Sequence, residues 1–213
     1  FASTTNRYEA NADATLKLSK RWSTSLLVHY ENETKAHDGN DDGFVDIPQV
    51  EQYNVWNRWA YMGDHYVFQA GIKALSETRT SGQVNHGGTM HSGDLYKVGI
   101  DTERYEFFTK NAYIFNKEKN TNLALILSTT LHNQDATYGR KLYNVDQTNV
   151  YASLMFETEF NPQNSFSAGL SFNYDAYDQH YRLENTTDNP LKAFEKEAVP
   201  GAYVQYTLNL NDK

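Results

Sequence analysis

The chain has 213 residues, carries a formal net charge of -8 and contains no cysteine. The lack of cysteine excludes disulfides and cysteine-based metal sites. An acidic chain without clusters of Lys or Arg argues against a nucleic-acid partner. The mean hydropathy is -0.74, and no apolar run reaches the ~18 residues of a transmembrane helix. Transmembrane strands need an apolar residue only at every second position, so they remain compatible with this low hydropathy.

Apolar and polar residues alternate along most of the chain, as in β-strands with one apolar and one polar face. The pattern predicts an all-β fold of about nine antiparallel strands, each of roughly 11–14 residues. In chain order, the apolar positions are Tyr8, Ala10, Ala12, Ala14, Leu16 and Leu18; Trp22, Leu26, Val28 and Tyr30; Tyr53, Val55, Trp59 and Tyr61; Tyr66, Phe68, Ala70, Ile72 and Ala74; Tyr105, Phe107, Tyr113 and Phe115; Leu123, Leu125, Leu127 and Leu131; Val150, Ala152, Leu154 and Phe156; Phe166, Ala168, Leu170, Phe172 and Tyr174; Ala202, Val204, Tyr206 and Leu208.

The positions of the aromatic residues indicate which solvent meets the apolar face. Aromatic residues lie near the strand ends, and Ala, Leu and Val fill the positions between them. Outer-membrane barrels have this layout, with aromatic girdles that flank an apolar belt facing lipid. We therefore expect the apolar face to meet lipid and the polar face to line a lumen. A soluble β-sandwich, which buries its apolar faces, is an alternative.

The predicted connections alternate between short and long. The short ones lie near residues 20–21, 63–64, 118–120 and 161–164, and the long ones cover roughly residues 34–48, 79–100, 135–146 and 178–196. Short periplasmic turns and long extracellular loops are typical of outer-membrane barrels. We expect residues 1–213 to be part of a single transmembrane β-barrel domain. Bacterial single-chain barrels have even strand numbers, so nine strands predict a segment of a larger barrel.

The first long connection contains the most specific motif of the chain. Asp38, Asn40, Asp42 and Asp46 fit the first nine positions of a calcium loop, with Gly43 at its turn. The twelfth position is Gln49 instead of the usual bidentate Glu, and no helix is predicted on either side. The motif predicts a Ca²⁺ site at these four residues. An acidic surface loop is the alternative, because Asp, Asn and Gly also form turns.

The histidine and methionine residues that could bind a metal or take part in catalysis lie in patterns that have simpler explanations. His86, Met90 and His91 could bind haem or a soft metal, but their spacing fits a flexible Gly-rich loop better. His29 and His132 have serine neighbours on the polar face, yet the chain has no G-x-S-x-G motif of a hydrolase. We therefore expect no enzymatic activity.

Aromatic residues in or near the long connections have two interpretations. They could form a ligand-binding surface, or they could belong to the outer aromatic girdle, which is the interpretation that we favour. These residues are Trp56, Tyr96, Tyr138, Tyr177 and Tyr181.

Several segments in order resemble the barrel of TonB-dependent outer-membrane receptors of the siderophore, colicin or cobalamin receptor-like group. The likeness extends over nearly the whole chain. It is carried by residues 42–48 (DGFVDIP), 52–59 (QYNVWNRW), 69–71 (QAG), 77–83 (ETRTSGQ), 98–101 (VGID), 131–136 (LHNQDA), 169–172 (GLSF) and 197–202 (EAVPGA).

This resemblance implies a location and a transport function. The family has about 22 barrel strands and an N-terminal plug inside the barrel. Its members reside in the outer membrane of Gram-negative bacteria and take up ferric siderophores, haem or cobalamin. The implied partners are outer-membrane lipid, the small-molecule nutrient and the TonB complex, with a surface lipoprotein as a further candidate. Neither the plug nor the C-terminal strands of the family match this chain. Calcium in the extracellular loops of some members agrees with the predicted Ca²⁺ site. A self-contained porin and a soluble β-sandwich binding module are the competing hypotheses.

Overall fold

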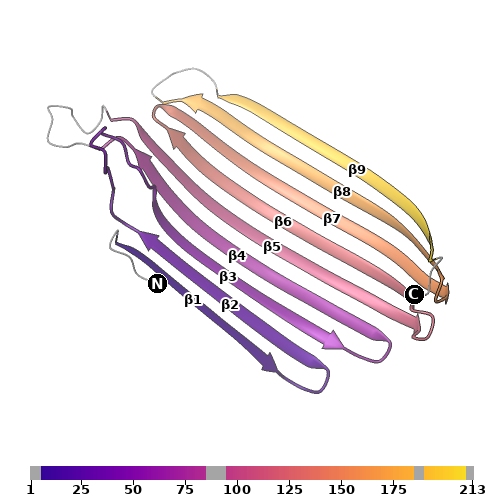
Figure 1. Ribbon diagram of the computed structural model, residues 1–213. Helices are drawn as coiled ribbons and strands as arrows, with labels where there is room; N and C mark the ends of the chain where they lie inside the picture. Colours follow the sequence, from indigo (N-terminus) through magenta and orange to yellow (C-terminus); the bar gives the residue numbers. More distant parts are fainter. Residues whose placement is uncertain (1–5, 85–94, 185–189, 210–213) are drawn as a thin grey trace.

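The computed structural model describes residues 6–84, 95–184 and 190–209. These residues form one antiparallel sheet in which each strand pairs with the next along the chain (Figure 1). The predicted all-β fold of nine antiparallel strands is confirmed. Among the described residues, no helix is long and apolar enough to cross a membrane. The strands are β1 (Arg7–Lys17), β2 (Trp22–Glu33), β3 (Gln49–Met62), β4 (Tyr66–Gly82), β5 (Lys97–Asn116), β6 (Thr121–Tyr138), β7 (Lys141–Asn161), β8 (Asn164–Leu183) and β9 (Leu191–Leu208).

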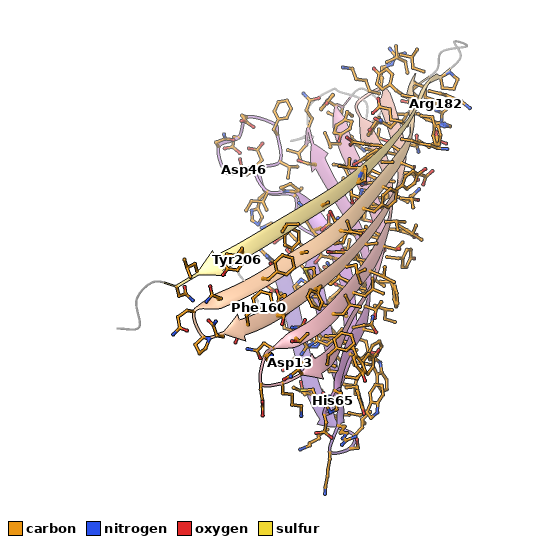
Figure 2. The ribbon with its side chains drawn as sticks, turned by 90° about the vertical axis from the view of Figure 1, so that its right-hand side faces the viewer. Asp13, Asp46, His65, Phe160, Arg182 and Tyr206 are labelled. Carbon is orange, nitrogen blue, oxygen red and sulfur yellow. The ribbon has the colours of Figure 1, made fainter. Side chains whose placement is uncertain are left out.

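The register of the sheet places the apolar stripe of every strand on one face. Val28 lies opposite Val55, and Leu154 lies opposite both Leu125 and Leu170. A shift by one residue would move a strand's whole apolar set to the other face. The matched register therefore separates an apolar face from a polar face across all the strands. Figure 2 shows that the sheet is twisted and curved, with β9 inclined to the strands behind it.

The described residues form a single layer without an internal core. Ala136 is the one buried apolar residue among them, whereas Val204 is 75% exposed and Leu170 is 60% exposed. A soluble β-sandwich would cover this apolar face with a second sheet. No second sheet lies on it in the described part of the chain. The apolar face therefore needs an apolar environment outside this sheet.

The strands from β4 to β9 are longer than the sequence predicts. They contain 17 to 21 residues, whereas the predicted 11–14 residues fit only β1, β2 and β3. The predicted loop at residues 135–146 is wrong, because β6 continues to Tyr138 and β7 begins at Lys141. Beyond the apolar belt both faces are polar, so the alternation disappears although the strands remain paired. Asn133, for example, donates a hydrogen bond to Asp146 Oδ1 at 2.6 Å.

The other connections agree better with the sequence. The first long connection occupies residues 34–48 as predicted, and the four short turns are confirmed. The long connections predicted at residues 79–100 and 178–196 exist, but strand residues occupy both ends of each range. The sequence pattern therefore underestimates the lengths of the strands only at the end of the sheet where the long connections lie.

Gly71, near the middle of β4, allows an aromatic ring to lie against the polar face. It is opposite Arg58 on β3 and Phe108 on β5. A Cβ atom at this position would overlap the Phe108 ring and would lie 3.2 Å from the carbonyl oxygen of Asn57. The missing side chain of Gly71 thus provides the space that the Phe108 ring occupies.

We expect Gly71→Ala to lower the free energy of unfolding by about 1–3 kcal/mol, because the added methyl group overpacks this contact. Gly99→Ala is the matched control, since a Cβ at Gly99 has no heavy atom within 4 Å. The measurement is the urea unfolding of the full-length protein in detergent, followed by tryptophan fluorescence. Gly71→Ala combined with Phe108→Ala should recover part of the loss. Equal stabilities of the two single variants would contradict this account.

Candidate functional site

The apolar face carries an aromatic row at each end of its aliphatic belt. Near the short turns, the ring centroid of Trp22 lies 5.1 Å from that of Tyr61 and 6.1 Å from that of Phe68. Toward the long connections, the centroids of Tyr30 and Tyr53 are 5.0 Å apart. Rings at the two edges of an apolar belt are typical of a surface that meets lipid between two headgroup regions.

A charged turn lies next to the first aromatic row. Arg21 Nη2 donates a hydrogen bond to Asp64 Oδ2 at 2.7 Å and joins the β1–β2 turn to the β3–β4 turn. The hydrogen bond with Tyr61 and the nearby Asp64 carboxylate raise the pKa of Arg21. An arginine side chain is charged in proteins, and a charge at this position belongs in water beyond the apolar belt.

The polar face holds a network of ion pairs across β1 and β2. Arg7 Nη2 lies 2.9 Å from Glu31 Oε1. The His29 ring lies 3.8 Å from both Glu9 and Glu31, and its Nδ1 is 2.7 Å from Asn11 Oδ1. These contacts link side chains of one face across the strand pair. They give this part of the polar face a charged surface.

Amides and carboxylates form a second network on the polar face of β7 and β8. The Asp175 carboxylate accepts hydrogen bonds from Asn149 at 2.9 Å and from Asn173 at 2.8 Å. Gln147 donates to Asp175 at 3.1 Å and to the Tyr177 hydroxyl at 2.7 Å. The cluster pairs these polar groups with one another and forms a hydrophilic part of the same face.

Backbone hydrogen bonds join neighbouring connections into one rim. The N–H of Val45 donates to the carbonyl of Gly82 at 2.8 Å, and the N–H of Val84 donates to the carbonyl of Gly43 at 2.9 Å. Residues 43–45 therefore run beside the end of β4. The N–H of Gln83 bonds the carbonyl of Tyr96, and the N–H of Gly139 bonds the carbonyl of Lys97, each at 2.7 Å.

The predicted calcium residues lie within this rim and organise their own loop. Asp38 accepts the N–H groups of Asp42 at 3.2 Å and Gly43 at 2.8 Å, and Asp46 accepts the N–H of Gly39 at 2.6 Å. Asn40 Nδ2 donates to Asp42 Oδ2 at 3.0 Å. Their oxygens suit Ca²⁺ chemically. Within residues 6–84, 95–184 and 190–209, however, no three acidic or histidine side chains are placed to hold a metal ion. The Ca²⁺ site at Asp38, Asn40, Asp42 and Asp46 stays a prediction.

If the loop binds Ca²⁺, calcium chloride should raise the Tm of the full-length protein, and Asp42→Ala should reduce that increase because a ligand is lost. Saturating ion would stabilise the folded state by about 2.7 kcal/mol at a hundred times its Kd. Asp41→Asn removes the same charge at a position that is not a ligand in the motif, so it is the matched control. The measurement is thermal melting with calcium and with EDTA. A Tm of the unmutated protein that does not respond to calcium would eliminate the site.

The histidines singled out from the sequence do not form a pair. Both His29 and His132 lie on the polar face, but β3, β4 and β5 separate their strands. The Nδ1 atom of His132 is buried without a hydrogen-bond partner in the described residues. His86, Met90 and His91 lie outside the described residues. The structure thus assembles no hydrolase site from His29 and His132.

Four of the aromatic residues that we assigned to the girdle have strand positions on the polar face instead. Trp56 is on the polar face, where the guanidinium carbon of Arg58 lies 5.3 Å from its ring centroid. Tyr177 is also on the polar face, bonded to Gln147. The girdle assignment is therefore wrong for Trp56, Tyr138, Tyr177 and Tyr181, because their strand positions have the parity of the polar residues. Strand parity was available in the sequence and is the signal that identifies them.

Two solved structures are similar to this chain. The ferric yersiniabactin uptake receptor FyuA from Yersinia pestis matches with a TM-score of 0.61 and 12% identity, over 97% of this chain and 35% of the receptor. The alcaligin outer membrane receptor FauA from Bordetella pertussis matches with a TM-score of 0.51 and 10% identity, over 99% of this chain and 40% of the receptor. No protein-family model and no curated protein matches. The chain thus has the fold of somewhat over a third of each receptor.

Proposed function

We propose that this chain is part of the barrel wall of a TonB-dependent outer-membrane receptor that takes up a bulky, scarce nutrient. The observation that supports this most strongly is the match of nearly the whole chain to two receptors, one described as an uptake receptor and one as an outer membrane receptor. A ferric siderophore is the favoured substrate class, with haem and cobalamin as the other members of the predicted range.

The two faces of the sheet fit the two environments of such a wall. The apolar belt between the aromatic rows faces lipid, and the polar networks of β1–β2 and β7–β8 face an aqueous lumen. Lipid offers no hydrogen bonds to the free edges of β1 and β9, so we propose that further strands pair with both edges. The rim around residues 43–45 and 82–84 lies at the extracellular end, where the nutrient is captured.

In this proposal, residues 1–213 belong to the barrel domain, and the plug and the TonB-contacting segment belong to other parts of the receptor. The wall itself does not move the nutrient. It holds the rim in place, surrounds the plug and provides a hydrophilic surface along the path. The partners are outer-membrane lipid, the nutrient, the TonB complex and, as a further candidate, a surface lipoprotein. The location is the outer membrane of a Gram-negative bacterium.

The experiment that tests the proposed function is uptake of iron complexes by cells that lack the gene. We expect the full-length product in the outer-membrane fraction, with a folded form that migrates differently on a gel before and after heating. Uptake of at least one radiolabelled ferric chelate should require both this gene and TonB. A product in the soluble fraction, or uptake that persists without TonB, would refute the receptor function.

Leu125→Asp should block assembly of the barrel, because this side chain lies on the apolar face opposite Asn111 and Leu154. A Lys or Arg facing the middle of the bilayer costs about 2–4 kcal/mol, and an Asp on the lipid face is also unfavourable although its cost is smaller. Ser128→Asp is the matched control, since Ser128 is on the polar face of the same strand. The measurement is the fraction of heat-modifiable protein after folding into lipid vesicles. Normal folding of Leu125→Asp would contradict the assignment of the lipid face.

A further inference from the structure

Five side chains gather on the polar face midway between the two aromatic rows. Arg58 lies opposite Gly71, which lies opposite Phe108, and Trp56 lies opposite Lys73. The set also includes Lys110, two positions beyond Phe108 on the same face. We call it the basic–aromatic patch, and it comprises Trp56 and Arg58 of β3, Lys73 of β4, and Phe108 and Lys110 of β5.

Two of the three cations of the basic–aromatic patch lie near a ring. The guanidinium carbon of Arg58 is 5.3 Å from the Trp56 ring centroid, and Lys110 Nζ is 6.0 Å from the Phe108 ring centroid. Both distances are within the range of cation–π attraction. Gly71 makes room for the Phe108 ring. The cations and the rings thus form one continuous surface in which a positive charge and an aromatic face are neighbours.

The basic–aromatic patch has an excess of positive charge on a face that is otherwise rich in carboxylates. Among the described residues, neither Arg58 nor Lys110 forms a salt bridge. Lys73 Nζ lies 3.5 Å from Glu106 Oε1, but that oxygen is also 2.7 Å from Arg104 Nε. Lys73 therefore shares the Glu106 carboxylate with Arg104, and the basic–aromatic patch keeps an excess of positive charge. The whole chain has a net charge of -8, so this excess is a local property.

A hollow of about 350 Å³ adjoins the basic–aromatic patch, which is enough for a small ring compound. Trp56 and Lys73 line the side of the hollow next to the patch, and Leu27 contributes apolar surface. Its far side carries Asp13 on β1 and His29 on β2. A bound anion would consequently lie toward Lys73 and away from the Asp13 carboxylate.

We propose that the basic–aromatic patch binds small molecules that carry a carboxylate on an aromatic ring. The carboxylate would pair with Arg58, Lys73 or Lys110, and the ring would stack on Trp56 or Phe108. The proposal rests on the proposed function, because only there does this face line an aqueous path. It adds a second contact for the nutrient, at the middle of the wall, below the rim that captures it. A ligand of this class would be attracted along the wall instead of being repelled by the carboxylates.

The experiment uses the full-length protein in detergent and three probes of similar size. Benzoate has charge and ring, benzamide has the ring without the charge, and cyclohexanecarboxylate has the charge without aromaticity. Binding is measured by saturation-transfer NMR and tryptophan fluorescence. The patch variant is Arg58→Gln with Lys73→Gln and Lys110→Gln. The control variant removes the same charge from the opposite face, with Arg182→Gln, Lys192→Gln and Lys196→Gln.

We expect benzoate to bind the unmutated and control proteins roughly tenfold more tightly than benzamide, and the patch variant to lose this preference. Trp56→Leu should reduce the preference of benzoate over cyclohexanecarboxylate. If the triple variant does not assemble, the single variant Arg58→Gln is measured in its place. We expect it to bind benzoate about threefold more weakly than the unmutated protein. Equal benzoate binding by the patch and control variants, or by Arg58→Gln and the unmutated protein, would overturn the inference.

Failure of this inference is distinguishable from failure of the proposed function. The protein could be heat-modifiable and present in the outer-membrane fraction while the patch mutations leave its benzoate binding unchanged. That result would refute ligand binding by the patch but not the proposed receptor function. Protein that is absent from the outer-membrane fraction would reject the receptor wall and, with it, the role of the patch on an aqueous path.

Discussion

The hydrogen-bonded register between neighbouring strands is the constraint on which the rest of this structure depends. Side chains alternate along a strand, so a single matched register decides the environment of every residue in the sheet at once. Eight strand pairs keep this match from β1 to β9. The apolar face, the two aromatic rows and the polar networks all follow from it. No interior core contributes, because the described residues form only one layer.

The polar face is not a uniform hydrophilic surface. Near β1 and β2 it consists of ion pairs, near β7 and β8 it consists of amides around Asp175, and between them it has the unbalanced cations and rings of β3 to β5. In the first region Arg7 pairs with Glu31, and in the second the amides bond to Asp175, whereas Arg58 and Lys110 of the third region form no salt bridge among the described residues. In the receptor that we propose, this face would attract dissolved anions chiefly at its middle strands.

The sequence predicted the fold well because the strongest signal, period-two alternation, is local. It also identified the first long connection and the girdle residues Trp22 and Tyr61. It failed beyond the apolar belt, where Asn133 and Asp146 face each other in paired strands that show no hydrophobic alternation. The basic–aromatic patch could not be found in this way, since Arg58, Lys73 and Lys110 are far apart along the chain and meet only through the register. The calcium motif was visible as a spacing, but spacing alone does not fix where the carboxylates point.

The hydrogen bonds of the rim have a consequence for how such a protein can diversify. The segment 43–45 is paired with residues 82–84, and these in turn are bonded to Tyr96. An insertion or deletion within the paired residues 43–45 or 82–84 would break the pairing with the neighbouring segment, so its effect would not stay local. Point substitutions of outward side chains leave the backbone pairing intact. Selection for a new ligand would therefore be expected to change residue identities in these paired segments long before it changes their lengths.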